Sequence, residues 1–174
     1  MSAPFLSTPR LDLWQPRVTD LAGLCALVEA EETRRFLGPA SPAPENQFDR
    51  LLRNAGGWSL YGYGIAVVRM RGADDIVGTC GVFHSWRGFG KGMDDTPEAG
   101  WIIRHDHCGK GLAREAATAM LGWFDANFGP RRIACMIEEG HVVSDRLARS
   151  LGFVPYDRQE DDGETPLILY ERLA

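Results

Sequence analysis

The sequence lacks the features that mark secreted, membrane-spanning or metal-stapled proteins. Its first residues hold no basic stretch followed by an apolar core, so we expect no secretory leader. No apolar run approaches the ~20 residues that cross a bilayer. The four cysteines form no Cys-x-x-Cys pair, which argues against a disulfide scaffold or a structural zinc site. We therefore expect a reduced, cytoplasmic protein with no membrane partner and no metal.

The chain also lacks a positive charge balance and any sign of a second domain. It has 174 residues and a formal net charge of −5. Because an acidic surface repels phosphate backbones, we expect no nucleic-acid partner. The length fits one domain, and no repeat, low-complexity tract or long linker divides it. We expect a single domain over residues 1–174, with its core at about 8–173.

Apolar periodicity predicts strands and helices in alternation. Residues 20–28 have helical spacing, with Thr19 or Asp20 as the cap. A second helix should start at Ser41-Pro42 and stop at Gly56-Gly57. Its predicted buried stripe is Phe48, Leu51, Leu52 and Ala55. Further helices are expected from about Gly111 to Gly129 and from Val142 to Leu151.

Strand-like composition predicts seven strands, with loops over 38–45 and 87–97, the latter mobile. The strands cover residues 10–15, 63–70, 75–84, 98–105, 132–138, 154–159 and 166–173. A helix lies between the fourth and fifth strands. Such a crossover implies a parallel pair within a mixed sheet.

Residues 104–116, RHDHCGKGLAREA, combine metal ligands, glycines and cations. His105, His107 and Cys108 do not face one way in an extended strand, and a closed zinc site needs four converging ligands. A phosphate loop of the GxxxxGK type requires Ser or Thr after the lysine, where Gly111 stands. The dinucleotide fingerprint fails because Arg114 occupies the place of its third glycine.

Gly109-Lys110-Gly111 nevertheless shares two features with those phosphate motifs, which are turn-forming glycines and a position at the start of a helix. These residues lie between a strand and a helix start, and glycine lets a backbone approach its ligand closely. Free N–H groups and the positive end of the helix favour a phosphate, with added charge from Lys110 and Arg114. The pattern predicts a pyrophosphate site, and a plain tight turn is the alternative.

Five segments together resemble one enzyme family. Cys108 to Ala116 resembles the CoA-binding motif of the GNAT acetyltransferases, in the branch of ribosomal-protein-alanine N-acetyltransferases and their small-molecule relatives. Four more segments resemble motifs of that branch in the same order, over nearly the whole chain. These are Thr8 to Leu13, Ile76 to Thr79, Glu98 to Trp101, and Ser144 with Leu151-Gly152-Phe153.

The resemblance implies a fold, a cosubstrate and a reaction. The fold would be α/β (α+β), with a mixed, mostly antiparallel twisted sheet of about six or seven strands. Helices would cover both faces, and a parallel strand pair would flank the CoA site. Acetyl-CoA would donate an acetyl group to a primary amine, either a protein N-terminus or a small molecule, in a monomer or homodimer. The residues expected to hold CoA are Trp101, Ile102, Ile103, Cys108, Gly109, Lys110, Gly111, Leu112, Ala113, Arg114 and Ser144.

Direct acetyl transfer requires the amine to lose a proton, because α-amino groups have a pKa of ~8 and lysine-type amines ~10.4. We expect Glu98, at a strand start, to act as general base. His141 could handle protons, and Ser144 could donate a hydrogen bond to the leaving thiolate or the pantetheine arm. Either residue could instead cap a helix.

The sequence departs from the family pattern at three positions. Asp106 replaces Gln or Arg, His141 replaces Asn, and Ala148 replaces a tyrosine that protonates the thiolate in many relatives. These departures leave two alternatives open. The protein could be a non-catalytic CoA-binding or sensing module, or a transferase that uses another acyl-CoA.

Overall fold

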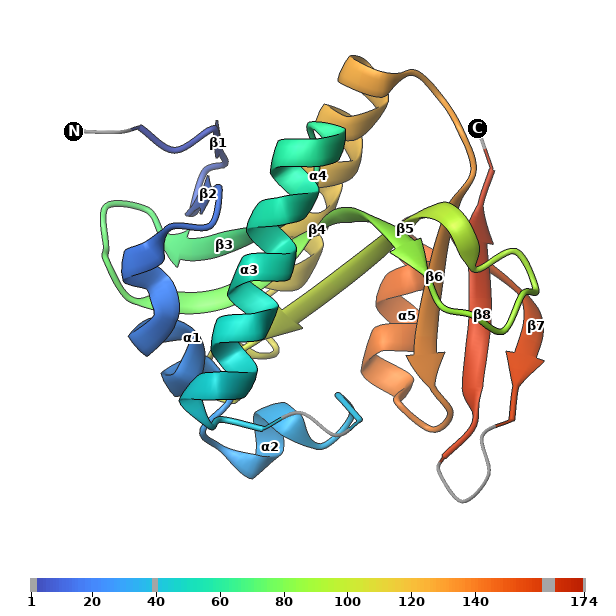
Figure 1. Ribbon diagram of the computed structural model, residues 1–174, viewed down its shortest axis with the longest axis horizontal. Helices are drawn as coiled ribbons and strands as arrows, with labels where there is room; N and C mark the ends of the chain where they lie inside the picture. The colour runs from blue at the N-terminus through green and yellow to red at the C-terminus, as the bar shows by residue number, and fades with distance from the viewer. Residues whose placement is uncertain (1–2, 39–40, 161–164, 174) are drawn as a thin grey trace.

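A single mixed sheet organises the computed structural model, which describes residues 3–38, 41–160 and 165–173. Its eight strands follow the order β1-β2-β3-β4-β5-β6-β8-β7 (Figure 1). All neighbouring strands are antiparallel except β5 and β6, which are parallel. The strands are β1 (Leu6–Ser7), β2 (Leu11–Trp14), β3 (Ile65–Met70), β4 (Ile76–Trp86), β5 (Asp94–Ile103), β6 (Ile133–Glu138), β7 (Val154–Gln159) and β8 (Leu167–Arg172). The predicted fold class is confirmed, with the two-residue β1 added to the seven predicted strands.

Helices cover both faces of this sheet. They are α1 (Leu21–Leu27), α2 (Glu31–Arg34), α3 (Pro44–Tyr61), α4 (Leu112–Phe128) and α5 (Val142–Ser150). In Figure 1, α1 and α3 cross in front of the sheet, and α4 runs behind it. No helix among the described residues is both long enough and apolar enough to cross a membrane.

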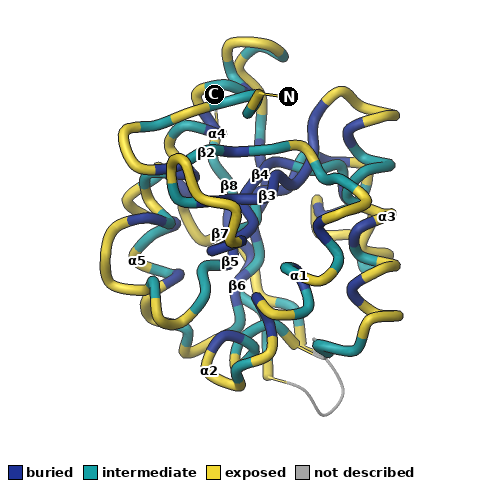
Figure 2. The backbone as a smooth tube through the Cα atoms, turned by 90° about the vertical axis from the view of Figure 1, so that its left-hand side faces the viewer, coloured by how far each residue is buried: buried dark blue, intermediate teal, exposed yellow. Residues whose placement is uncertain are grey.

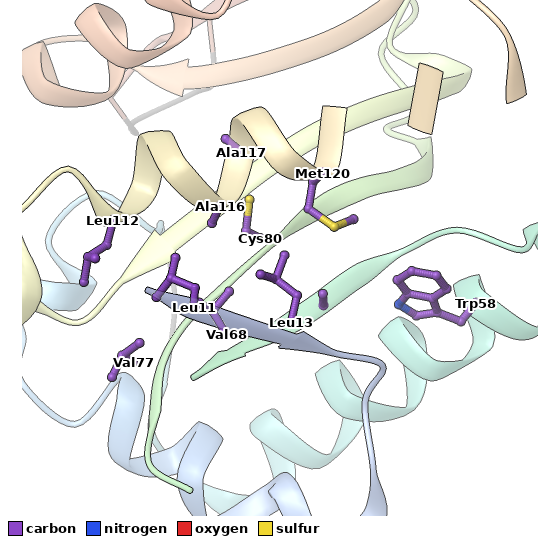
Figure 3. Packing of buried hydrophobic residues seen from close by; sticks show 11 residues of the cluster. Leu11, Leu13, Trp58, Val68, Val77, Cys80, Leu112, Ala116, Ala117 and Met120 are labelled. Atoms are coloured by element: carbon purple, nitrogen blue, oxygen red, sulfur yellow. The ribbon is translucent and has the colours of Figure 1, made fainter. Parts of the chain in front are cut away.

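The core has a separate apolar layer on each face of the sheet. On one face, Leu112, Ala116 and Met120 of α4 pack against Leu11 and Leu13 of β2 (Figure 3). On the other face, a second cluster joins α1 and α3 to three strands. Its members are Leu24, Leu27, Val28, Leu51, Val67, Ile76 and Ile102. Figure 2 shows the buried residues running along the strands, with exposed residues on the outer sides of α3 and α5.

Helix α3 contradicts two predictions. It starts at Pro44, continues through Gly56-Gly57 and ends at Tyr61, before the C-cap Gly62, whose φ of 74° is left-handed. Tertiary packing outweighs the helix-breaking tendency of the two glycines. The buried Trp58 packs against aromatic rings of Phe5 and Trp123, and its indole N–H donates to the Ile65 carbonyl at 2.9 Å.

The stripe predicted for this helix was also wrong in part. Phe48 and Leu52 are 44% and 54% exposed, whereas Gln47, Leu51 and Trp58 face the protein. Gln47 can be buried because its amide donates to the Ser41 carbonyl at 2.6 Å. The helix is therefore rotated relative to the face that hydrophobicity alone selects.

The predicted loop 87–97 is shorter than expected. Strand β4 extends to Trp86 and β5 starts at Asp94, so residues 87–93 connect them. Met93 is fully buried against Ala134 and Leu169. Glu98 consequently lies within a strand and not at its start. The predicted loop 38–45 lies partly outside the described residues, because residues 39–40 are not described.

The start of α1 differs in detail from the predicted cap. Asp20 occupies the N-cap position, but its carboxylate makes no cap hydrogen bond to the helix. It is buried in an ion pair with Arg69 at 2.5 Å, and it accepts the Arg17 backbone N–H at 2.8 Å. The side chain therefore links α1 to β3.

Candidate active site

The parallel strands β5 and β6 separate soon after they meet. They pair at one position, Glu98 opposite Ala134. Beyond it β5 runs on to Ile103 and stays paired with β4, while β6 runs to Glu138 paired with β8. Figure 1 shows the two strands diverging toward their carboxyl ends. The edge of β5 after Glu98 therefore has backbone groups that β6 does not use, and an extended ligand can pair with them.

A glycine turn lies where the diverging β5 leads into α4. Gly109 and Gly111 have φ angles of 74° and 76°, which favour glycine. Gly111 is the N-cap of α4 and provides no side-chain cap. The first N–H groups of a helix have no partner within it, so those of α4 are available to an anion. The predicted strand–turn–helix junction is confirmed, and its phosphate role stays a prediction.

Arg10 braces this turn from the far end of the sequence. Its Nε donates to Glu115 Oε2 at 2.6 Å, and its Nη1 donates to the Lys110 carbonyl at 2.8 Å. Thr8 adds a hydroxyl donor to Glu115 Oε1 at 2.6 Å. Sequence reasoning assigned no role to Arg10, because the partners are about one hundred residues apart. The one hint in the sequence was that Thr8 to Leu13 and Cys108 to Ala116 both resemble motifs of the same family.

The charged residues before the turn neutralise one another. Asp106 accepts hydrogen bonds from Arg104 Nε at 2.8 Å and Nη2 at 3.1 Å, and it contacts His107 Nδ1 at 2.9 Å. Arg104 and then His107 hold the pKa of Asp106 well below its usual range. The described residues include no group of three or more His, Cys, Asp or Glu side chains that could hold a metal ion.

Cys108 is not an activated thiol. The residue as a whole is exposed, but partial burial of its thiol, followed by the charge of Asp106, raises its pKa. Its Sγ contacts the carbonyls of Ile103 and Arg104 at 3.6 Å. A cysteine in this state is a poor nucleophile, because the thiolate is the reactive form.

Three predicted site residues come together on the side of α5. Trp101 Nε1 donates to Ser144 Oγ at 3.3 Å, and Ser144 Oγ lies 3.5 Å from His141 Nε2. The His141 ring stacks on Phe36, with 4.2 Å between ring centroids. Burial lowers the pKa of His141. Phe36 had no signal in the sequence, since it meets His141 only through the tertiary fold.

The segment that carries Phe36 contacts the ends of both diverging strands. Near β5, the Thr33 hydroxyl accepts the His105 backbone N–H at 3.1 Å. Near β6, Phe36 contacts His141, which follows that strand. Helix α2 and the residues after it therefore connect the ends of the two strands across their open side.

Glu98 lies apart from these residues. Side chains alternate along a strand, so Glu98 and Trp101 point to opposite faces of β5. The Glu98 side chain is 3% exposed and forms two hydrogen bonds with Arg87, from Nε at 2.8 Å and from Nη2 at 2.5 Å. No described hydrogen bond joins it to Ser144 or His141.

Comparisons with known proteins agree with this geometry. A model of the family described as "Acetyltransferase (GNAT) domain" matches residues 10–154. The chain therefore belongs to the GNAT acetyltransferases, a class of enzymes that transfer acyl groups from CoA thioesters. The predicted family resemblance is confirmed.

Individual relatives cover the chain to different extents. A GnaT-family acetyltransferase from Bordetella pertussis is 32% identical with a TM-score of 0.85, over 96% of this chain and 98% of that one. The uncharacterized protein YkkB of Bacillus subtilis is 28% identical over 64% of this chain, and the match spans 62% of YkkB. RimL, a ribosomal L7/L12 alpha-N-protein acetyltransferase solved with CoA, has a TM-score of 0.77 at 13% identity, over 95% of each chain, which shows a shared fold.

Proposed function

We propose that the protein transfers an acetyl group from acetyl-CoA to a primary amine by direct attack. One observation carries this proposal: β5 and β6 pair only at Glu98 and Ala134, and the glycine turn and uncapped start of α4 come after the end of β5. Family membership supports acetyl transfer. The likeness to RimL, which was solved with CoA, supports the cosubstrate.

In this proposal, CoA contacts mainly backbone groups. Its pyrophosphate accepts N–H groups from Gly109 to Arg114, where the helix end is positive. Its pantetheine arm pairs with the free edge of Trp101 to Ile103. Cys108, Lys110 and Leu112 contribute through their backbone, and Ser144 closes the opposite side. Asp106 points away from the phosphates, since Arg104 and His107 already bind its carboxylate.

His141 is the proposed proton acceptor. Burial lowers its pKa and so favours the neutral ring, which is the form that can accept a proton. The free amine nitrogen forms a bond to the acetyl carbon, the carbon–sulfur bond breaks, and the nitrogen loses a proton to His141. Ser144 donates a hydrogen bond to the leaving thiolate, a role that requires no tyrosine at Ala148.

Glu98 is the second candidate for the base. Its carboxylate already accepts two hydrogen bonds from Arg87, so both of its oxygens are engaged before an amine arrives. We therefore assign it mainly to positioning Arg87. Direct acetyl transfer needs only one base, so His141 and Glu98 are alternatives for the same role.

A thiol-release assay with acetyl-CoA and a panel of primary amines tests the reaction and separates the two bases. We expect H141Q to lower kcat by about 100-fold or more and to abolish the acidic limb of the pH profile. E98Q should keep that limb. The reverse result would assign the base to Glu98.

Two further outcomes would change the reaction itself. Binding of acetyl-CoA without thiol release from any amine would favour a non-catalytic CoA-binding module. Faster turnover with succinyl-CoA than with acetyl-CoA would favour the other acyl donor. A melting temperature that no CoA thioester raises would contradict the proposal altogether.

A further inference from the structure

Arg50 lies close enough to Arg53 and Arg87 for their charges to interact, and Arg87 lies near the place where β5 and β6 part. Arg87 follows β4 and reaches Glu98, the residue that pairs with Ala134 at the root of the separation. Arg50 and Arg53 come from α3, which covers the same face of the sheet as Glu98. Arg50 is half-buried and flanks the inward-facing stripe of Gln47, Leu51 and Trp58.

The charges of this cluster do not balance. Glu98 neutralises Arg87 through two hydrogen bonds. Arg50 and Arg53 take part in no hydrogen bond or ion pair with the described residues. Burial lowers the pKa of Arg50, and the nearby guanidinium groups of Arg53 and Arg87 lower it further. A half-buried cation among other cations is unfavourable unless an anion joins them.

CoA is a poor candidate for this anion. The turn assigned to its pyrophosphate, Gly109 to Gly111, lies past the far end of β5, several residues beyond Glu98. A pantetheine arm that lies along Trp101 to Ile103 brings its acetyl end toward Glu98, where the acceptor must also arrive. With CoA bound in the proposed way, the arginines lie on the acceptor side of the thioester.

We infer that Arg50, with Arg53 and Arg87, binds an anionic group on the acceptor, so that the preferred substrate is an amine carrying a carboxylate or a phosphate. This inference rests on the proposed amine acetylation. It also reverses the expectation from net charge, because the chain is acidic overall while this part of the surface is basic. Charge-assisted hydrogen bonds from guanidinium groups suit both anions.

Matched pairs of acceptors test the inference. We would measure kcat/KM with L-alanine against L-alaninamide and with phosphoethanolamine against ethanolamine. The anionic member of at least one pair should react about tenfold faster or more, and R50Q should abolish that preference by raising the acceptor KM. The KM for acetyl-CoA should not change. R50K keeps the charge and should keep most of the preference.

An exposed arginine on the other face of the sheet provides the control. Arg146 of α5 makes no described ion pair, and R146Q should leave every constant unchanged. Equal rates for both members of each pair, or an equal loss for both in R50Q, would overturn the inference while leaving acetylation intact. If no amine of either kind is acetylated although acetyl-CoA binds, the proposed function itself fails.

Discussion

The tripeptide Gly-Lys-Gly occurs twice in this chain, at 90–92 and at 109–111, and the two copies have opposite characters. Both place glycines at φ angles between 71° and 76°. In the first copy, the Gly90 N–H donates to Asp94 at 2.8 Å, the Gly92 carbonyl accepts Arg132 Nη1 at 2.8 Å, and Met93 comes next, in the core. In the second copy, the turn leads into α4 with no side-chain cap.

The difference shows that the tripeptide does not by itself define an anion site. In the first copy, Asp94 accepts the hydrogen bond from the Gly90 N–H, and the Arg132 guanidinium binds the Gly92 carbonyl. A Cβ on Gly92 would lie 3.0 Å from Arg132 Nη2, and one on the matching Gly111 would lie 3.5 Å from Arg10 Nη2, whereas a Cβ on Gly90 or Gly109 would meet nothing within 4 Å. The element after each turn, a strand or a helix, decides whether the N–H groups of the turn stay free.

The largest expected effect concerns the closed turn at residues 90–92. M93A should lower the free energy of unfolding by about 2–5 kcal/mol, because it leaves a cavity beside Ala134 and Leu169. Urea denaturation measures this loss. Calorimetric titration of acetyl-CoA should give an unchanged Kd. A parallel loss of affinity would show that the two turns are coupled.

The next prediction compares the closed turn directly with the open turn at residues 109–111. G109A and G90A each force alanine into a left-handed conformation in open space, at a cost of about 1–2 kcal/mol of stability. Because the methyl group added by G109A would face the proposed phosphates, only this variant should also weaken acetyl-CoA binding, by about tenfold or more. Equal Kd values for acetyl-CoA in the two variants would contradict binding of the pyrophosphate at the open turn.

A smaller effect should result from removing the brace of the open turn. R10A breaks the contacts to Glu115 and Lys110, and we expect about a fivefold rise in the KM for acetyl-CoA with little change in kcat. Because Arg10 is 46% exposed in its side chain, solvent limits the loss. A fall in kcat at unchanged KM would contradict a role in positioning the turn.

The smallest effect is a pH dependence of the closed turn. Backbone N–H groups, first that of Gly88, lower the pKa of Asp94 below 3.8. The carboxylate therefore stabilises the fold above about pH 4, and this contribution disappears as the pH falls through its lowered pKa. D94N should lower the melting temperature at pH 7 and have less effect at pH 3. D49N, at an exposed aspartate of α3, is the matched control.

Short-range patterns predicted much of the fold and part of the site. The strand–turn–helix junction at Gly109 to Gly111, helix α5 and strand β7 lie where local spacing placed them. Their signals act over a few residues, through glycine conformation and apolar periodicity. Helix α3 was mispredicted because Trp58 is held by Phe5, Trp123 and the Ile65 carbonyl, which the local pattern does not contain.

The chemistry of the site depended more on distant partners. Glu98 is an acid at a plausible position in the sequence, but the fold buries its side chain and pairs it with Arg87. The sequence shows only that His141 replaces the asparagine of the family pattern. The tertiary fold adds that its ring stacks on Phe36. The sequence also offered no sign that Asp106 would be bound by Arg104 and His107.

The sequence by itself determined the family, most of the order of strands and helices, and the glycine turn at residues 109–111. Those properties depend on residues that are neighbours along the chain. Only the tertiary structure decided which turn keeps its N–H groups free, which carboxylate is neutralised and which arginine lacks an anion among the described residues. These depend on contacts between distant segments, such as Arg10 with Glu115 and α3 with β5. A hydrogen bond or an ion pair changes the state of a group only when the fold brings its partner within reach.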